Sequence, residues 1–220
     1  MKVRDFALCI VLLAAATAAI LLVYRDLPVQ VPLHWNAHGE VDGYGPRWML
    51  FAIGPGLMGL ELAIFALLPV LSPRRFEIES FRATYVRLVL AAVAFPAYLL
   101  AVVLGAALTG RLDVSGAILG GVSVLTLVIG NVMGKVRRNF FIGIRTPWTL
   151  ASDRVWYATH RVAGKSMVLA GVASLGAALW GGLAGTIAWI ALILAGVMVP
   201  VAYSFVHYRA LERTGGLEVS

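Results

Sequence analysis

The chemically richest stretch of the chain is residues 134–165, GKVRRNFFIGIRTPWTLASDRVWYATHRVAGK, which lies between two long apolar runs. Asp153 and His160 in this stretch could act as an acid/base pair. If residues 149–163 form one helix, Asp153, Trp156 and His160 share a face, because residues three and four apart are neighbours on a helix. Nothing resembling a serine or cysteine nucleophile elbow or an HExxH motif accompanies them, which disfavours an enzyme.

Helix starts in this stretch can also be predicted. Pro147 after Thr146, or Asp153 after Ser152, would each begin a helix, since threonine and serine cap helices and proline suits the first helical position. Such a helix would lie at the membrane surface, with its tryptophans, Trp148 and Trp156, close to the lipid headgroups.

A second polar stretch, residues 25–47, contains four candidate zinc ligands within nine residues. Two histidines four apart share a face only on a helix, and the prolines and glycines of this stretch argue against one. The sequence therefore favours an extended-and-turn structure in which Asn36 and Asp42 fix the backbone, with zinc as the less favoured alternative. The candidate ligands are His34, His38, Glu40 and Asp42.

The composition places the chain in a lipid bilayer. Of 220 residues, 60% are hydrophobic and 13% charged, against about half and about a quarter in soluble domains. Six apolar stretches are long enough to cross a hydrocarbon core that needs about 20 residues. We predict an all-α polytopic membrane protein with six transmembrane helices, near residues 6–24, 48–71, 85–108, 114–133, 166–180 and 186–207.

The basic residues indicate the orientation of these helices. With the N-terminus inside, fifteen of the 18 lysines and arginines fall on one side of the membrane and three on the other. Because cytoplasmic loops carry the excess of positive charge, both termini and residues 134–165 are predicted to be cytoplasmic. The net charge of +7 is thereby explained by topology, and no direct nucleic-acid binding is expected.

Two polar side chains, Glu61 and Asn131, fall inside the predicted spans. A carboxyl group midway through a span costs about 2.5–3.5 kcal/mol or more, so Glu61 should face the bundle interior and find a partner, or be protonated. A functional role and a structural hydrogen bond to a neighbouring span both stay open. The candidate partners are Tyr98, Thr126, Asn131 and Tyr203.

The amino-acid sequence of residues 134–165 resembles the signature of the SdpI-type bacterial immunity proteins. The residues that carry the resemblance are Asn139, the run GIRTPWTL at 143–150, Trp156, and Thr159-His160-Arg161. In the outer stretch, Pro32, His34, Asn36, Gly39 and Asp42 resemble a short domain of unknown function that often precedes the SdpI-type segment.

The resemblance implies a multi-pass protein of the bacterial cytoplasmic membrane that protects the cell from a secreted antimicrobial peptide toxin. For some members of the family it also implies a second role, in which the toxin-engaged protein holds a transcriptional repressor at the membrane. That role needs a repressor partner, which one sequence does not show. No cofactor is implied.

We therefore predict one integral membrane domain, residues 1–220, composed of two units. A two-span unit, 1–71, carries the ordered outer loop 25–47, and an SdpI-like four-span unit, 83–207, carries the cytoplasmic loop 134–165. The alternatives are a membrane-embedded enzyme or metal-dependent protein, and a transporter that uses Glu61, although no inverted repeat is evident. As an immunity surface, the inner cluster would consist of Asn139, Arg145, Thr146, Pro147, Trp148, Asp153, Trp156, His160 and Arg161.

Overall fold

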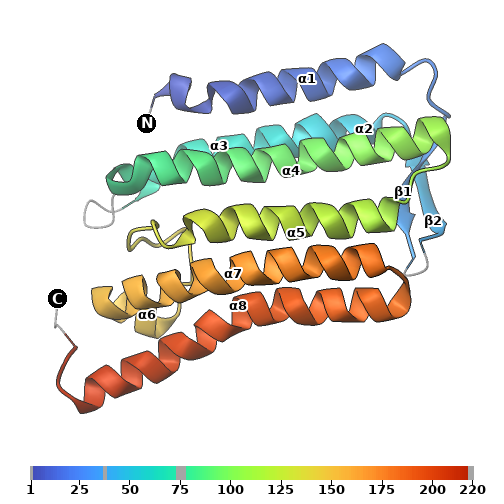
Figure 1. The fold of residues 1–220 in the computed structure, drawn as a ribbon. Coiled ribbons are helices and arrows are strands. Elements are labelled where there is room, and N and C mark those ends of the chain that lie inside the picture. Colours follow the sequence, from blue (N-terminus) through green and yellow to red (C-terminus); the bar gives the residue numbers. More distant parts are fainter. Residues whose placement is uncertain (1, 37–38, 73–77, 218–220) are drawn as a thin grey trace.

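Six long helices lie side by side in the computed structural model, which describes residues 2–36, 39–72 and 78–217 (Figure 1). Both termini lie at one end of the bundle, here called the inner end, and a β-hairpin covers the opposite, outer end. Six segments are long and apolar enough to cross a membrane, which confirms the predicted fold class. The main helices are α1 (Ala7–Val23), α3 (Leu57–Leu71), α4 (Arg82–Thr109), α5 (Val114–Met133), α7 (Asp153–Trp180) and α8 (Gly182–Arg213).

Short helical segments extend three of the spans. The 3-10 turns η1 (Val3–Phe6) and η4 (Ile78–Phe81) precede α1 and α4. The second span starts with α2 (Met49–Phe51) and passes through a π-helical segment, η2 (Ala52–Gly56), before α3. Pro55 lies inside η2, where its missing N–H suits the wider hydrogen-bond spacing of a π-helical turn.

The outer hairpin consists of β1 (Gln30–Trp35) and β2 (Val41–Pro46), which pair in antiparallel orientation. Its register shifts twice, between Pro32 and His34 and between His34 and Trp35, and the first shift follows a proline, which has no N–H to contribute to the ladder. The predicted extended-and-turn structure is therefore correct.

Small residues hold α5, α7 and α8 together. A Cβ atom added to Gly171 of α7 would lie 2.9 Å from Leu127 Cβ and Ser123 O of α5, and one added to Gly130 would lie 2.8 Å from Met167 Cβ. Close backbone approach of this kind is how helices associate in lipid, where burial of apolar surface gives no net gain. At the outer end, Gly181 has a φ of 72° and lets α8 start one residue after α7.

The inner end of α7 differs from the prediction. α7 begins at Asp153 rather than near residue 166, because its first turns are covered by protein instead of lipid. The single helix considered over 149–163 is not formed. The short helix α6 (Pro147–Ala151) ends before Ser152, whose extended backbone, with φ −145° and ψ 130°, separates it from α7.

Candidate functional site

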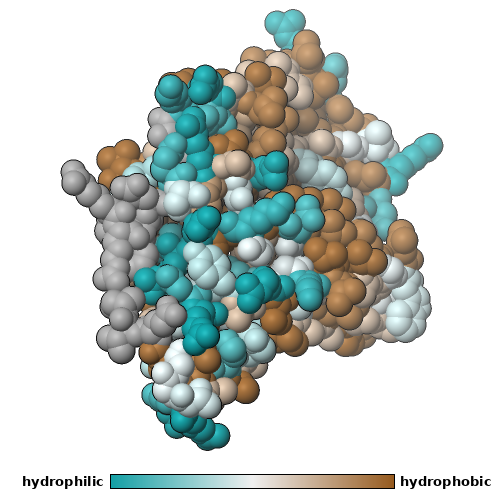
Figure 2. Space-filling model, turned by 60° about the vertical axis from the view of Figure 1, so that its left-hand side comes forward, coloured by the Kyte–Doolittle hydropathy of each residue, from teal (hydrophilic) through white to brown (hydrophobic). Residues whose placement is uncertain are grey.

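Residues 134–152, here called the inner cap, connect α5 to α7 and fold back over the first turns of α7. Figure 2 shows polar side chains gathered over this end of the molecule, with apolar residues along the side. Most of the cap has no regular secondary structure. Its buried backbone N–H and C=O groups therefore need side-chain partners.

Asn139 supplies four of these partnerships from a fully buried position. Its amide nitrogen donates to the carbonyls of Arg137, at 2.8 Å, and Ile142, at 3.0 Å. Its amide oxygen accepts from the N–H groups of Phe141, at 2.8 Å, and Ile142, at 2.7 Å. One side chain thus fixes the backbone on both sides of a tight turn.

Trp156 and His160 form the base on which the cap rests. Both are fully buried, and their rings stack with centroids 4.1 Å apart. The Trp156 indole N–H donates to the Val136 carbonyl at 2.8 Å. Trp156 is therefore an internal anchor of the cap, and the predicted position near lipid headgroups is wrong.

The hydrogen bonds of His160 determine its tautomer. The Ile144 N–H donates to Nε2 at 3.1 Å, so Nε2 carries no proton, and Nδ1 donates to the Trp156 carbonyl at 2.8 Å. Gly143 lies beside the Nε2 edge of the ring with a φ of 110°, and a Cβ there would collide with Nε2. Because both nitrogens of His160 are used by backbone, the imidazole is a structural group in this conformation.

Threonine hydroxyls start α6 within the cap and connect the cap to α8. Thr146 caps α6, accepting from the Thr149 N–H at 3.2 Å, and Pro147 occupies the predicted first helical position. The buried Thr149 hydroxyl donates to Ile144 O at 2.8 Å. Thr146 Oγ1 lies 3.2 Å from the Ser204 hydroxyl of α8.

Trp148 strengthens this attachment to α8, since its ring packs on Phe205 with centroids 5.0 Å apart. It is only partly exposed. The cap is thus fastened to both α7 and α8.

The charged residues of the cluster lie around this buried base. Arg138 Nε is 2.8 Å from Asp153 Oδ1. Arg145 and Arg161 are exposed, and Arg145 donates to the Phe140 carbonyl. Asp153 and His160 are therefore engaged with different partners, and the acid/base pair considered from the sequence is not formed.

Three residues that fasten the cap were not among the predicted site residues: Gly143, Thr149 and Ser204. Thr149 could have been found, because threonine three residues after a capping threonine is a recognisable helix start. Ser204 is 58 residues from Thr146, and no local pattern indicates that contact.

At the outer end, the hairpin turn is held by Asn36, as predicted. Its amide oxygen accepts from the Glu40 N–H at 3.0 Å, and its amide nitrogen donates to Glu40 Oε2 at 3.0 Å. Asp42, however, lies 2.5 Å from His34 Nδ1 instead of fixing backbone.

The zinc alternative involves His34, His38, Glu40 and Asp42, of which the structure describes His34, Glu40 and Asp42. His38 lies outside the described residues. Within the described part of the chain, no group of three or more potential metal ligands occurs. His34 and Glu40 each contact another side chain of the hairpin.

Inside the bundle, Glu61 Oε2 is buried without a hydrogen-bond partner among the described residues. Two of the predicted partners are engaged elsewhere: the Tyr98 hydroxyl donates to Ala117 O, and the Thr126 hydroxyl to Val122 O. The predicted hydrogen bond to a neighbouring span is therefore absent at this oxygen. Asn131 is exposed near the inner end of α5.

Comparison with known proteins finds a family match for the region of each end, the inner cap and the outer hairpin. Residues 135–204, which include the inner cluster, match the SdpI/YfhL protein family. Residues 11–59, which include the outer hairpin, match a domain of unknown function, DUF1648. No solved structure matches the chain.

The chain is also 28% identical over 212 residues to the immunity protein SdpI of Bacillus subtilis, a similarity that covers 96% of this chain and 99% of that protein. The residues that fold the inner cap lie within the matched family region, and the similarity continues through all six helices to the outer hairpin. The chain therefore contains an SdpI/YfhL family segment at residues 135–204, and its similarity to an SdpI immunity protein extends over nearly its whole length.

Proposed function

We propose that this protein resides in the bacterial cytoplasmic membrane and protects the cell from a secreted antimicrobial peptide toxin. The observation that carries the proposal is the similarity to an immunity protein over 96% of the chain. Similarity of this extent includes both the outer hairpin and the inner cap, so it applies to the whole arrangement and not to an isolated motif.

The two ends of the molecule have separate tasks in this proposal. The distribution of basic residues orients the termini and the inner cap toward the cytoplasm, so the hairpin faces the side from which a secreted peptide arrives. Tyr44 on the hairpin is 65% exposed and Trp48 just after it is 58% exposed. Exposed aromatic side chains at the membrane surface suit contact with an amphipathic peptide.

The inner cap supports this activity from the opposite side. Asn139 fixes the backbone within the cap, Trp156 and His160 join the cap to α7, and Thr146 connects it to α8. The cap thereby fixes the positions of α7 and α8 at their inner ends. A transcriptional repressor, the second partner that the resemblance implies for some members, would meet the exposed arginines of this face, and its co-purification with and without toxin tests that role.

Survival of a toxin-sensitive bacterium challenged with an Sdp-type peptide tests the proposed function. Cells expressing the wild type should survive, whereas Arg145→Ala and Asn139→Ala should fail to protect at equal membrane abundance. Arg213→Ala removes an exposed arginine from the end of α8, away from the cap, and should protect like the wild type. Equal killing of cells with and without the wild-type protein would contradict the proposal.

The two cap variants separate two explanations. Asn139→Ala removes four hydrogen bonds inside the cap, whereas Arg145 is exposed and makes one described bond, to Phe140 O. Loss of protection by both variants would assign a role to the exposed face as well as to the fold of the cap. Retained protection by Arg145→Ala would remove that side chain from the mechanism.

A further inference from the structure

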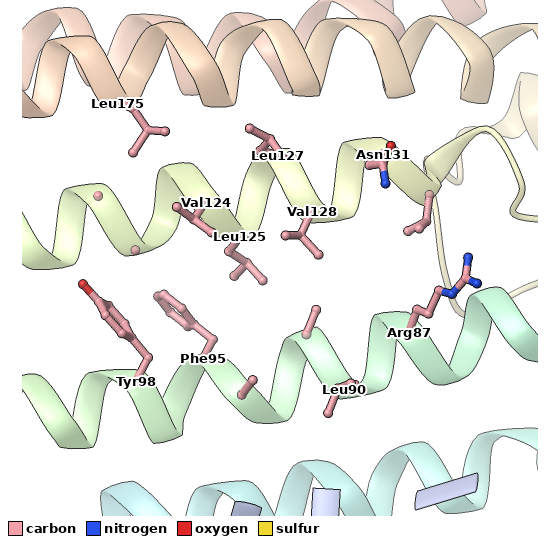
Figure 3. A pocket seen from close by; sticks show the side chains of 15 residues that line it. Arg87, Leu90, Phe95, Tyr98, Val124, Leu125, Leu127, Val128, Asn131 and Leu175 are labelled. Carbon is pink, nitrogen blue, oxygen red and sulfur yellow. The ribbon is translucent and has the colours of Figure 1, made fainter. Parts of the chain in front are cut away.

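A groove of about 820 Å³ runs between α4 and α5, within the range of about 300–1,000 Å³ usual for ligand sites. Figure 3 shows it between the two ribbons, with Phe95 and Tyr98 rising from α4 and Val124, Leu125 and Val128 descending from α5. Leu175 of α7 contributes at one side. The groove is distinct from the inner cap and from the hairpin, and nothing in the proposed immunity function depends on it.

Gly120 of α5 leaves open space in the groove. A Cβ atom added to Gly120 would meet no atom within 4 Å, and one added to Gly121 would collide with the Tyr98 ring. α5 therefore presents bare backbone where a larger residue would fill the groove. A flexible apolar chain can occupy the volume that Gly120 leaves open, whereas the Tyr98 ring fills the space beside Gly121.

Two polar side chains line the groove at its inner end. Arg87 comes from α4 and Asn131 from α5, and in Figure 3 both side chains lie at the same end of the close-up. Both are exposed, and no ion pair of Arg87 with a carboxylate occurs within residues 2–36, 39–72 and 78–217. None of the described lining residues is acidic. The groove thus offers one cation and one amide to an anion, above an apolar channel.

The length of the groove matches the depth of one membrane leaflet. Arg87 and Tyr98 are eleven residues apart on α4, which at about 1.5 Å per residue is about 16 Å. Half of a hydrocarbon core about 30 Å thick is about 15 Å. A molecule with its anionic group at Arg87 would therefore extend its apolar part to the middle of the bilayer.

We propose that this groove binds an anionic phospholipid of the inner leaflet, with its phosphate on Arg87 and Asn131 and an acyl chain between α4 and α5. Charge complementarity and leaflet-deep length favour this occupant over a peptide or a second copy of the chain. Basic pockets between transmembrane helices on the cytoplasmic side are a known type of headgroup site. An arginine holds phosphate oxygens well because its guanidinium donates several hydrogen bonds in one plane.

Native mass spectrometry of the detergent-purified full chain tests the proposal, with dioleoyl phosphatidylglycerol or dioleoyl phosphatidylcholine added. The wild type should retain one phosphatidylglycerol about fivefold more than phosphatidylcholine, because Arg87 attracts the net negative charge of phosphatidylglycerol, whereas the choline cation of phosphatidylcholine offsets the charge of its phosphate. Arg87→Gln should lose this preference. Arg213→Gln, which changes an exposed arginine at the same end but outside the groove, should keep it.

A second variant tests the apolar part. Gly120→Leu should fill the groove and lower retention of both lipids, whereas Gly176→Leu should not, because Gly176 has equally open surroundings but lies outside the groove. Equal retention of the two lipids by the wild type, or unchanged retention by Gly120→Leu, would overturn the proposal. Displacement of the lipid by inorganic phosphate would mean that Arg87 binds free anions instead of a lipid headgroup. A dimer that is lost on Gly120→Leu would mean that a second copy of the chain occupies the groove.

Discussion

His160 connects the cap to α7 through one acceptor atom. Its Nε2 accepts the Ile144 N–H, while stacking on Trp156 holds the ring in place. The imidazole is fully buried, so no water can replace the bond if Nε2 is lost. A side chain of similar shape without an acceptor would keep the stacking and leave the Ile144 N–H unsatisfied.

We therefore expect His160→Phe to lower the free energy of unfolding by about 1–3 kcal/mol, the cost of leaving one buried donor unpaired. His207→Phe is the matched control. That histidine is only partly buried and stacks on Tyr203, so its change should stay within about 0.5 kcal/mol. Thermal unfolding of the purified variants in detergent measures both, and equal midpoints for His160→Phe and the wild type would contradict the assignment.

Glu61 presents the opposite case, a buried polar atom with no partner among the described residues. A carboxyl group in this position lowers stability, and a functional role would explain why the chain carries it. Glu61→Leu should raise the thermal midpoint because it removes the unsatisfied oxygen. If the carboxyl group has a functional role, the same variant should lose protection against the toxin, and Glu61→Gln should then separate shape from ionisation; a lower midpoint for Glu61→Leu would show that the oxygen is satisfied.

At the scale of helices, the contact between α5 and α7 depends on the absence of side chains. The Cβ of an alanine at Gly171 would lie 2.9 Å from both the backbone of α5 and Leu127 Cβ, and rigid helix backbone cannot move away cheaply. Gly176 lies five residues later on the same helix and has nothing within 4 Å.

Gly171→Ala should therefore destabilise the protein by about 1–3 kcal/mol through overpacking. Gly176→Ala should be neutral or stabilising by up to about 1 kcal/mol, because alanine has the higher helix propensity. Unfolding of the two variants in the same detergent gives the comparison. Similar midpoints for both would mean that α5 and α7 are not in close contact.

The helices could be predicted from sequence because bilayer thickness sets the length of an apolar span. Helix starts at Pro147 and Asp153 were also predictable, since capping is a local interaction. The position of Trp156 was not. An indole N–H can meet water at a membrane surface or a carbonyl inside the protein, and here its partner is Val136, 20 residues earlier in the chain.

In the outer loop, too, one feature could be predicted from local sequence and another could not. Its prolines and glycines exclude a helix, which is a local effect, so an extended structure was predictable. The pairing of His34 with Asp42 depends on which residues face each other across the hairpin. That choice follows from the strand register, which shifts between Pro32 and Trp35 and cannot be derived from composition.

At the scale of the whole molecule, the orientation can be tested because the chain has one cysteine. Cys9 is 1% exposed within α1 and should react little with thiol reagents. Tyr44→Cys would place a thiol on the outer hairpin, and Gly215→Cys would place one at the exposed end that follows α8.

A membrane-impermeant maleimide should label Tyr44→Cys in intact cells, and Gly215→Cys only after the cells are permeabilised. The expectation follows from fifteen basic residues on the inner side against three on the outer. Labelling of Gly215→Cys in intact cells would reverse the orientation and move the inner cap to the outside.

The cap that covers the first turns of α7 also constrains how the protein is made. Residues 166–180 are the part of α7 that follows its last charged residue, Lys165. This uncharged part is about 22 Å long at about 1.5 Å per residue, which is shorter than a hydrocarbon core of about 30 Å. α8 follows after a single residue, Gly181. During synthesis, α7 and α8 should therefore leave the insertion machinery for the bilayer together as a helical pair.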